Sequence, residues 1–189
     1  MKKANTQKLV AGAILAALVM VLQLVAGYIR LGPASITLTL APIIIGGALY
    51  GKKMGAFLGL VFAVAVLVEP GTAAFYACNW WATIIIVLAK SVISAFVAAW
   101  VYEIISRKNG LLAVIVSGIV LPLLNTGIFV VGSYFFFVPV FNPTGDLSGW
   151  PLLTAIALGI AINFAVELGV NLVLSTGITT VIKAVKKAN

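Results

Sequence analysis

Three polar residues recur at every fourth position in an otherwise apolar stretch near the end of the chain: Asn163, Glu167 and Asn171. Residues four apart share one face of an α-helix. A further ionisable residue, Lys90, follows the uninterrupted apolar run 84–89. Ionisable groups at membrane depth are rare and mark the paths of polar solutes. These residues predict a binding site for a polar solute, and the alternative is a structural seam in which Lys90 and Glu167 neutralise each other.

The composition indicates that these residues belong to a membrane protein. Hydrophobic residues make up 63% of the chain and charged residues 8%, whereas a soluble domain carries about 25% charged residues. The net charge is +8, and most Lys and Arg fall in four short clusters. Basic residues in short loops are typical of the cytoplasmic side, so the clusters predict cytoplasmic termini and contact with the lipid bilayer, with no nucleic acid as partner. The clusters lie at 2–8, 52–53, 107–108 and 183–187.

The apolar segments between these clusters predict an all-α fold, an integral membrane bundle of six transmembrane helices in a single domain, 1–189. None of the segments alternates apolar and polar residues as the strands of a membrane barrel do. The second segment is short and interrupted by Pro42 and by Gly46 and Gly47, so a re-entrant hairpin with the third is an alternative there. The expected spans are 8–28, 36–50, 54–68, 81–102, 111–138 and 150–182.

Other candidate binding groups lie beside a proline or near the outer ends of the spans. Asn125 follows Pro122, which frees a carbonyl one turn earlier, and Asn125 can bond either that carbonyl or a solute. Asn79 and Trp80 lie in the aromatic cluster 75–81, which predicts a pocket wall or lid. The alternative for this cluster is an ordinary interfacial aromatic belt. The remaining candidates are Arg30 and Tyr134.

Small residues near the start of the first span suggest a surface for close helix contact. Ala13 and Ala17 are four apart, which places two methyl groups on one face and permits another helix to approach. The sequence leaves two interpretations open: packing within the bundle, or docking of a partner protein. A second set of small residues occurs in the third span at Gly55, Ala56 and Gly59.

The residues that the chain lacks limit its chemistry. It has no His and a single Cys, so no Cys/His zinc site is expected, and it has only four acidic residues. It also lacks the glycine-rich phosphate loop with Lys and Ser/Thr. We therefore expect no catalytic residues, no bound metal and no cofactor. We also expect that the protein is not an enzyme. Uphill movement of a solute would need a partner protein or an ion gradient.

Several segments together resemble the S components of energy-coupling factor (ECF) vitamin transporters, and most closely the pantothenate-type members. The resemblance implies a multi-pass protein of the cell membrane that binds a vitamin in an outward-facing pocket. It also implies docking on a membrane coupling subunit beside two cytoplasmic ATPase subunits, with Ala13 and Ala17 matching the docking motif. The resemblance is carried by the Ala-rich first span, 31–42, 48–56, the pattern Pro122-x-x-Asn125-Thr126-Gly127 and the series 163–171.

The candidate residues favour an acidic, hydroxylated vitamin. Arg30 and Lys90 could meet a carboxylate, and charge-assisted hydrogen bonds of this kind are strong. Pantothenate, with a carboxylate, an amide and two hydroxyls, fits this set. Riboflavin, folate or niacin are alternatives, as is a stand-alone proton-coupled transporter that uses Glu167. Amide and hydroxyl partners would come from Asn79, Asn125, Asn163 and Asn171, and stacking surfaces for a flat vitamin from Trp80, Trp81 and Tyr134.

Overall fold

The computed structural model describes residues 2–27 and 39–188, and this part of the chain is helical without strands. The prediction of an all-α fold is therefore confirmed for the described residues. The helices are α1 (Lys2–Ala26), α2 (Leu40–Tyr50), α3 (Lys52–Val68), the short 3₁₀ helix η1 (Pro70–Thr72), α4 (Ala73–Ile105), α5 (Gly110–Phe136), α6 (Val138–Phe141) and α7 (Gly149–Ala188).

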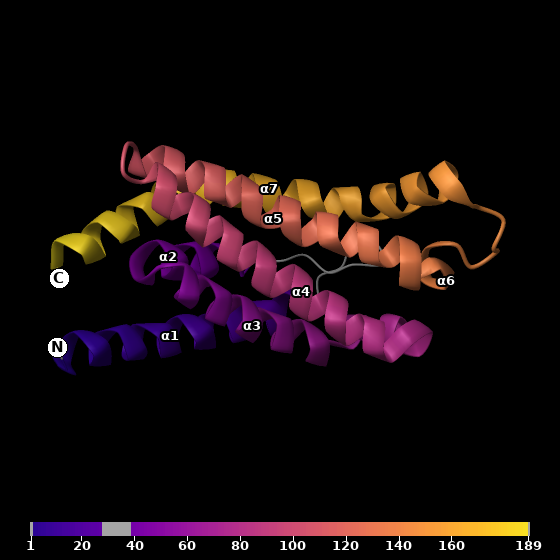
Figure 1. The fold of residues 1–189 in the computed structure, drawn as a ribbon, viewed down its shortest axis with the longest axis horizontal. Coiled ribbons are helices and arrows are strands. Elements are labelled where there is room, and N and C mark those ends of the chain that lie inside the picture. Colours follow the sequence, from indigo (N-terminus) through magenta and orange to yellow (C-terminus); the bar gives the residue numbers. More distant parts are fainter. Residues whose placement is uncertain (1, 28–38, 189) are drawn as a thin grey trace.

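The long helices lie side by side in an elongated bundle (Figure 1). The start of α1, the α2–α3 turn, the α4–α5 turn and the end of α7 lie at one end of this bundle, and α6 lies at the other (Figure 1). Within the described ranges, four helices are long and apolar enough to cross a membrane: Thr6–Ala26, Pro70–Ile105, Gly110–Phe136 and Gly149–Lys187. The chain is thus a multi-pass membrane protein. The number of six spans stays a prediction.

The second segment differs from its predicted form. α2 begins at Leu40 and continues through Gly46 and Gly47 without interruption, so the predicted break at these glycines is wrong. Pro42 lies in the first turn, where a missing N–H removes no helical hydrogen bond. With 11 residues, α2 is about 16 Å long, roughly half of the hydrocarbon thickness. The predicted residues 36–38 of this span lie outside the described part.

The fourth helix begins earlier than predicted and is interrupted. α4 starts at Ala73, and Asn79 adopts non-helical angles (φ −159°, ψ 97°) within it. The Oδ1 atom of Asn79 accepts a hydrogen bond of 3.2 Å from the backbone N–H of Ala82, as the side chain of a helix N-cap does. The hydroxyl of Thr83 donates to the Asn79 carbonyl over 2.8 Å. Asn79 therefore ends one helical segment, 73–78, and starts the next.

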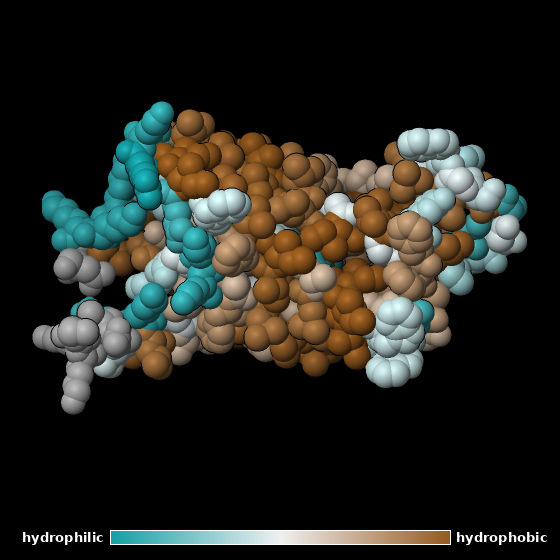
Figure 2. All heavy atoms as spheres, in the orientation of Figure 1, coloured by the Kyte–Doolittle hydropathy of each residue, from teal (hydrophilic) through white to brown (hydrophobic). Residues whose placement is uncertain are grey.

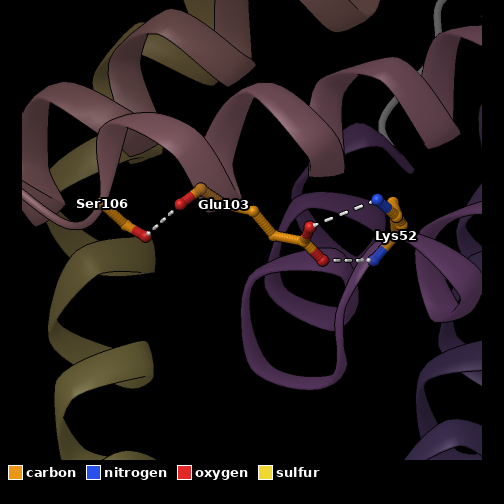
Figure 3. Close-up of polar contacts among 3 residues, drawn as sticks. All are labelled: Lys52, Glu103 and Ser106. Atoms are coloured by element: carbon orange, nitrogen blue, oxygen red, sulfur yellow. Dashed lines mark hydrogen bonds and ion pairs between the residues drawn. The ribbon is translucent and has the colours of Figure 1, made fainter.

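Hydrophilic residues gather at the end of the bundle that carries the start of α1 and the end of α7, and a broad apolar belt follows (Figure 2). Glu103 joins α4 to the start of α3 at this end. Its carboxylate accepts a 3.0 Å hydrogen bond from the Lys52 backbone N–H and lies 3.9 Å from the Lys52 ammonium group (Figure 3). This distribution is the one that the positive-inside rule describes, while the cytoplasmic location of this end stays a prediction.

Close helix contacts fill the interior of that half. A Cβ atom added to Gly59 would lie 2.6 Å from the Ser91 carbonyl oxygen, and one added to Gly55 would lie 2.9 Å from that of Ala95. Real Cβ atoms do not approach backbone oxygens so closely, so these glycines allow α3 to lie directly against α4. The predicted small residues of the third span thus serve contacts within the bundle. Leu58 and Phe62 complete the buried apolar core beside them.

Candidate functional site

The other half of the bundle contains a cavity of about 60 Å³ among α1, α4, α5, α7 and the α3–α4 connection. Its wall is unusually polar for the interior of a membrane bundle, where every polar group has to find a partner inside the protein or in a ligand. It also contains three phenylalanines. The polar lining residues are Gln23, Glu69, Thr72, Thr83, Lys90, Asn125, Thr126, Asn163 and Glu167.

Lys90 lies at the centre of the charge distribution in this cavity. The residue is only 9% exposed, and its ammonium nitrogen lies 5.1 Å from the ring centroid of Phe129 and 5.7 Å from that of Phe62. Two carboxylate residues, Glu69 and Glu167, line the same cavity. No carboxylate of the described residues, however, forms an ion pair with Lys90 within 4 Å. The pair Lys52–Glu103 lies at the other end of the bundle. Lys90 is thus stabilised by aromatic rings and by charges at longer range, and its three N–H donors remain available to a ligand.

The predicted polar face of α7 divides into two parts. Asn163 and Glu167 are buried and line the cavity, as the solute-binding interpretation expects. Asn171 is also buried but lies outside the lining, and its Nδ2 atom donates a 3.3 Å hydrogen bond to the Gly118 carbonyl of α5. Asn171 therefore joins α7 to α5, whereas Asn163 and Glu167 line the cavity.

The role of Asn171 follows from the proline in α5. Pro122 has no N–H, so the carbonyl of Gly118, four residues earlier, lacks its helical hydrogen bond. Asn171 supplies the missing donor. Asn125 is consequently not needed for this carbonyl. It lies in the cavity wall, 4% exposed, and its Oδ1 atom has no hydrogen-bond partner among the described residues.

Two buried lining residues were not among the sequence candidates. The Nε2 atom of Gln23, on α1, donates a 2.9 Å hydrogen bond to the Oε2 atom of Glu69, and the two side chains are 1% and 6% exposed. Glu69 precedes Pro70 and Gly71, a turn sequence that by itself does not indicate a buried binding residue. For Gln23 a signal was present, since it is the single polar residue in the apolar run 18–27.

Aromatic rings close one side of the cavity. Phe75 meets Phe129 and Phe137 edge to face, with centroid distances of 5.4 and 5.0 Å. Phe75 belongs to the short helical segment 73–78 that precedes the break at Asn79. Of the aromatic cluster 75–81, Phe75 lines the cavity, while the role of the cluster as a pocket wall or lid stays a prediction.

Several predicted binding residues lie apart from the cavity. Trp80 is 66% exposed on the surface of α4. Tyr134 lines a separate apolar groove with Trp150, between α5 and the start of α7. Asn79 forms the helix restart and is not among the cavity lining. Arg30 lies outside the described residues. The structure thus brings together Lys90, Asn125, Asn163 and Glu167 from the predicted set.

The small residues of α1 face two directions. Gly12 is buried, and a Cβ atom there would lie 2.8 Å from the Met54 side chain of α3. Ala16 packs partly buried against the apolar core. Ala13 and Ala17 are exposed on the surface of the bundle. The bundle therefore leaves uncovered the two alanines that resemble a docking motif.

A bundle of membrane-spanning helices that encloses a polar, charge-containing cavity is the arrangement expected of a membrane protein that binds a polar solute. Comparison with known families agrees with this class. The family model described as "ECF transporter, substrate-specific component" matches residues 7–179. The chain belongs to this family, whose members are transporter subunits and not enzymes. No curated protein and no solved structure matches the chain.

Proposed function

We propose that this chain is the vitamin-binding S component of an ECF importer of the cell membrane, and that its substrate is pantothenate. The observation that carries the proposal is the buried Lys90, whose N–H donors face a cavity that also contains the amides of Asn125 and Asn163. In this arrangement the ammonium group binds the carboxylate of the vitamin. The two amides serve its hydroxyl and amide groups.

Substrate binding requires the cavity to expand. Sites for small molecules measure about 300–1,000 Å³, whereas this cavity measures about 60 Å³. The segment from η1 to the break at Asn79 is the part of the cavity wall that can move most easily. The helix is interrupted at Asn79, so the segment is not held rigidly by the rest of α4. Movement of this segment would carry Phe75 away from Phe129 and open the cavity toward the end opposite the termini.

Energy for transport comes, in this proposal, from partner subunits. Ala13 and Ala17 would contact a membrane coupling subunit that is associated with two cytoplasmic ATPase subunits, because their exposed methyl groups permit close approach of a helix. With both termini in the cytoplasm, the hydrophilic end of the bundle that carries the start of α1 and the end of α7 faces these ATPases (Figure 2). Six spans, including the short α2, complete the topology.

The proposal is tested by calorimetric titration of pantothenate into the purified protein in detergent, without nucleotide. We expect a dissociation constant in the nanomolar to micromolar range, since the protein itself contributes the binding groups. Riboflavin, folate and niacin serve as competitors. Tight binding of one of these with no binding of pantothenate would overturn the substrate assignment. Binding that appears only with added ATP would contradict the division of labour between subunits.

A second candidate function rests on Glu167, a carboxylate that is 4% exposed at membrane depth. Such a group can carry a proton, so the chain alone could couple solute uptake to a proton gradient. Reconstitution of the purified chain into vesicles decides between the two functions. Pantothenate accumulation driven by an imposed proton gradient, without any ATPase, would support the stand-alone transporter and contradict the S-component proposal.

A further inference from the structure

Within the proposed vitamin site, the amide of Gln23 is one of the buried amides whose oxygen lacks a partner among the described residues. The Oε1 atom of Gln23 has no hydrogen-bond partner among the described residues, although the side chain is 1% exposed. Gln23 lines the cavity from α1. A buried acceptor without a donor is costly, so such an atom indicates a group that is satisfied in another state of the protein.

The orientation of this amide is fixed by Glu69. An ionised carboxylate only accepts hydrogen bonds, so it must face the NH₂ end of the Gln23 amide, and the 2.9 Å contact has this polarity. The Oε1 atom of Gln23 is then the end of the amide that is left without a partner among the described residues. Lys90, in contrast, presents only donors. Because Lys90 and Gln23 both line the cavity, it brings together donors for an anionic group and an amide whose oxygen has no partner among the described residues.

We propose that the Oε1 atom of Gln23 accepts a hydrogen bond from a hydroxyl or amide N–H of the vitamin, and that Glu69 is the positioning residue for this acceptor. The inference rests on the proposed function and adds a residue of α1 to the site. It selects vitamins that carry a hydrogen-bond donor in addition to a carboxylate. It also places the substrate in contact with the helix that exposes Ala13 and Ala17.

The experiment combines protein variants with ligand analogues. Pantothenate and three analogues, each lacking one of its two hydroxyls or its amide N–H, are titrated into wild type, Gln23→Met and Glu69→Gln. Gln23→Met should lower the affinity for pantothenate about tenfold or more but leave the affinity for one analogue unchanged, because that analogue has no donor for Gln23. Glu69→Gln should show the same pattern with a smaller loss, since a glutamine no longer fixes the orientation of the Gln23 amide.

Gln7→Met is the matched control, because Gln7 is exposed on the same helix. This variant should bind all four ligands with the affinity of wild type. An equal loss of affinity for all four ligands in Gln23→Met, or no loss, would overturn the proposal. An equal loss for all ligands in Glu69→Gln would remove its positioning role. If one variant does not fold, the other still gives the analogue pattern.

Failure of the proposed substrate is recognised separately. If wild type does not bind pantothenate, the vitamin that copurifies with each protein is quantified by mass spectrometry. Gln23→Met should then carry less of this vitamin than Gln7→Met. Equal amounts in the two variants would overturn the role of Gln23, whatever the vitamin is.

Discussion

The two halves of the bundle differ in the hydrogen-bond partners that they give to buried polar side chains. In the half near the termini, Ser117 donates to the Ala98 carbonyl over 3.0 Å, and Asn171 donates to that of Gly118. In the half with the cavity, the side-chain oxygens of Gln23 and Asn125 have no hydrogen-bond partner among the described residues. The same residue types thus join helices in one half and remain available in the other. Burial and polarity alone do not distinguish the bonded amide of Asn171 from the amides of Gln23 and Asn125, whose oxygens have no hydrogen-bond partner among the described residues.

The packing of the two halves differs in the same way. Glycines bring α3 against α4 in the half near the termini, so no space remains there for a solute. In the other half, the break at Asn79 and the bulky Phe75, Phe129 and Phe137 hold the helices around a cavity. We infer that the first half is a rigid base and that the second half adapts to the ligand. Each prediction below tests one side of this contrast.

The largest loss of stability is expected from placing a large side chain between α3 and α4 in the rigid base. Gly59→Leu should prevent folding, with a loss of about 3 kcal/mol or more, because even its Cβ atom would lie 2.6 Å from a backbone oxygen of α4. Thermal unfolding and size-exclusion profiles in detergent measure this. Gly169→Leu is the matched control, since a Cβ atom there meets nothing within 4 Å. A stable, monodisperse Gly59→Leu protein would contradict the rigid-base interpretation.

The next largest effect is expected from the cavity charge. Lys90→Met should weaken pantothenate binding by about 2–5 kcal/mol, the usual cost of removing one partner from a buried charged pair. Folding should be retained, because methionine can occupy the space between the rings of Phe62 and Phe129. Lys108→Met, at an exposed position of the α4–α5 turn, is the control. Unchanged affinity in folded Lys90→Met would exclude Lys90 from the site and favour the structural seam with Glu167.

A smaller, paired effect separates the two members of the α7 face. Asn163→Leu and Glu167→Leu should each weaken binding by about 1–3 kcal/mol, because both side chains line the cavity. Asn171→Leu should instead lower the unfolding temperature and leave the affinity nearly unchanged, because it leaves the Gly118 carbonyl without a donor and lies outside the cavity lining. Titration and thermal unfolding of the same preparations measure both quantities. Loss of binding in Asn171→Leu with unchanged stability would extend the site into the base.

These results show how far the sequence alone reaches. The all-α fold follows from uninterrupted apolar segments. The structure places Lys90, Asn125, Asn163 and Glu167, which depth and polarity had singled out, in the lining of one cavity, while their contact with a solute stays a prediction. The sequence could not separate Asn171 from its neighbours. Its role depends on the carbonyl that Pro122 frees on another helix, and such a contact between helices has no local pattern.

Gln23 and Glu69 show the opposite difficulty. Glu69 lies in a turn sequence with no distinctive signal, and Gln23 is marked only by its apolar surroundings. Their contact with each other arises only when α1 packs against the end of α3. Trp80 shows the limit of composition, because an aromatic cluster can place one ring in a cavity and the next toward lipid. Phe75 lines the cavity, while Trp80 is 66% exposed.

The smallest effect on the isolated protein is expected at the exposed face of α1. Ala13→Trp or Ala17→Trp should leave pantothenate affinity and unfolding temperature nearly unchanged, because neither alanine is buried in the bundle. Uptake by cells should nevertheless be lost, since an indole would hold a partner helix several ångströms away. The measurements are affinity on purified protein, uptake in cells, and copurification of the coupling subunit from membranes.

Ala16→Trp is the matched contrast on the same helix. Ala16 packs against the apolar core, so the substitution should destabilise the bundle and reduce binding as well. A difference between position 16 and positions 13 and 17 would therefore separate the inner face of α1 from a docking face. If Ala13→Trp retains both copurification and uptake, this face does not dock on a partner. The stand-alone transporter that uses Glu167 would then account better for an uncovered α1.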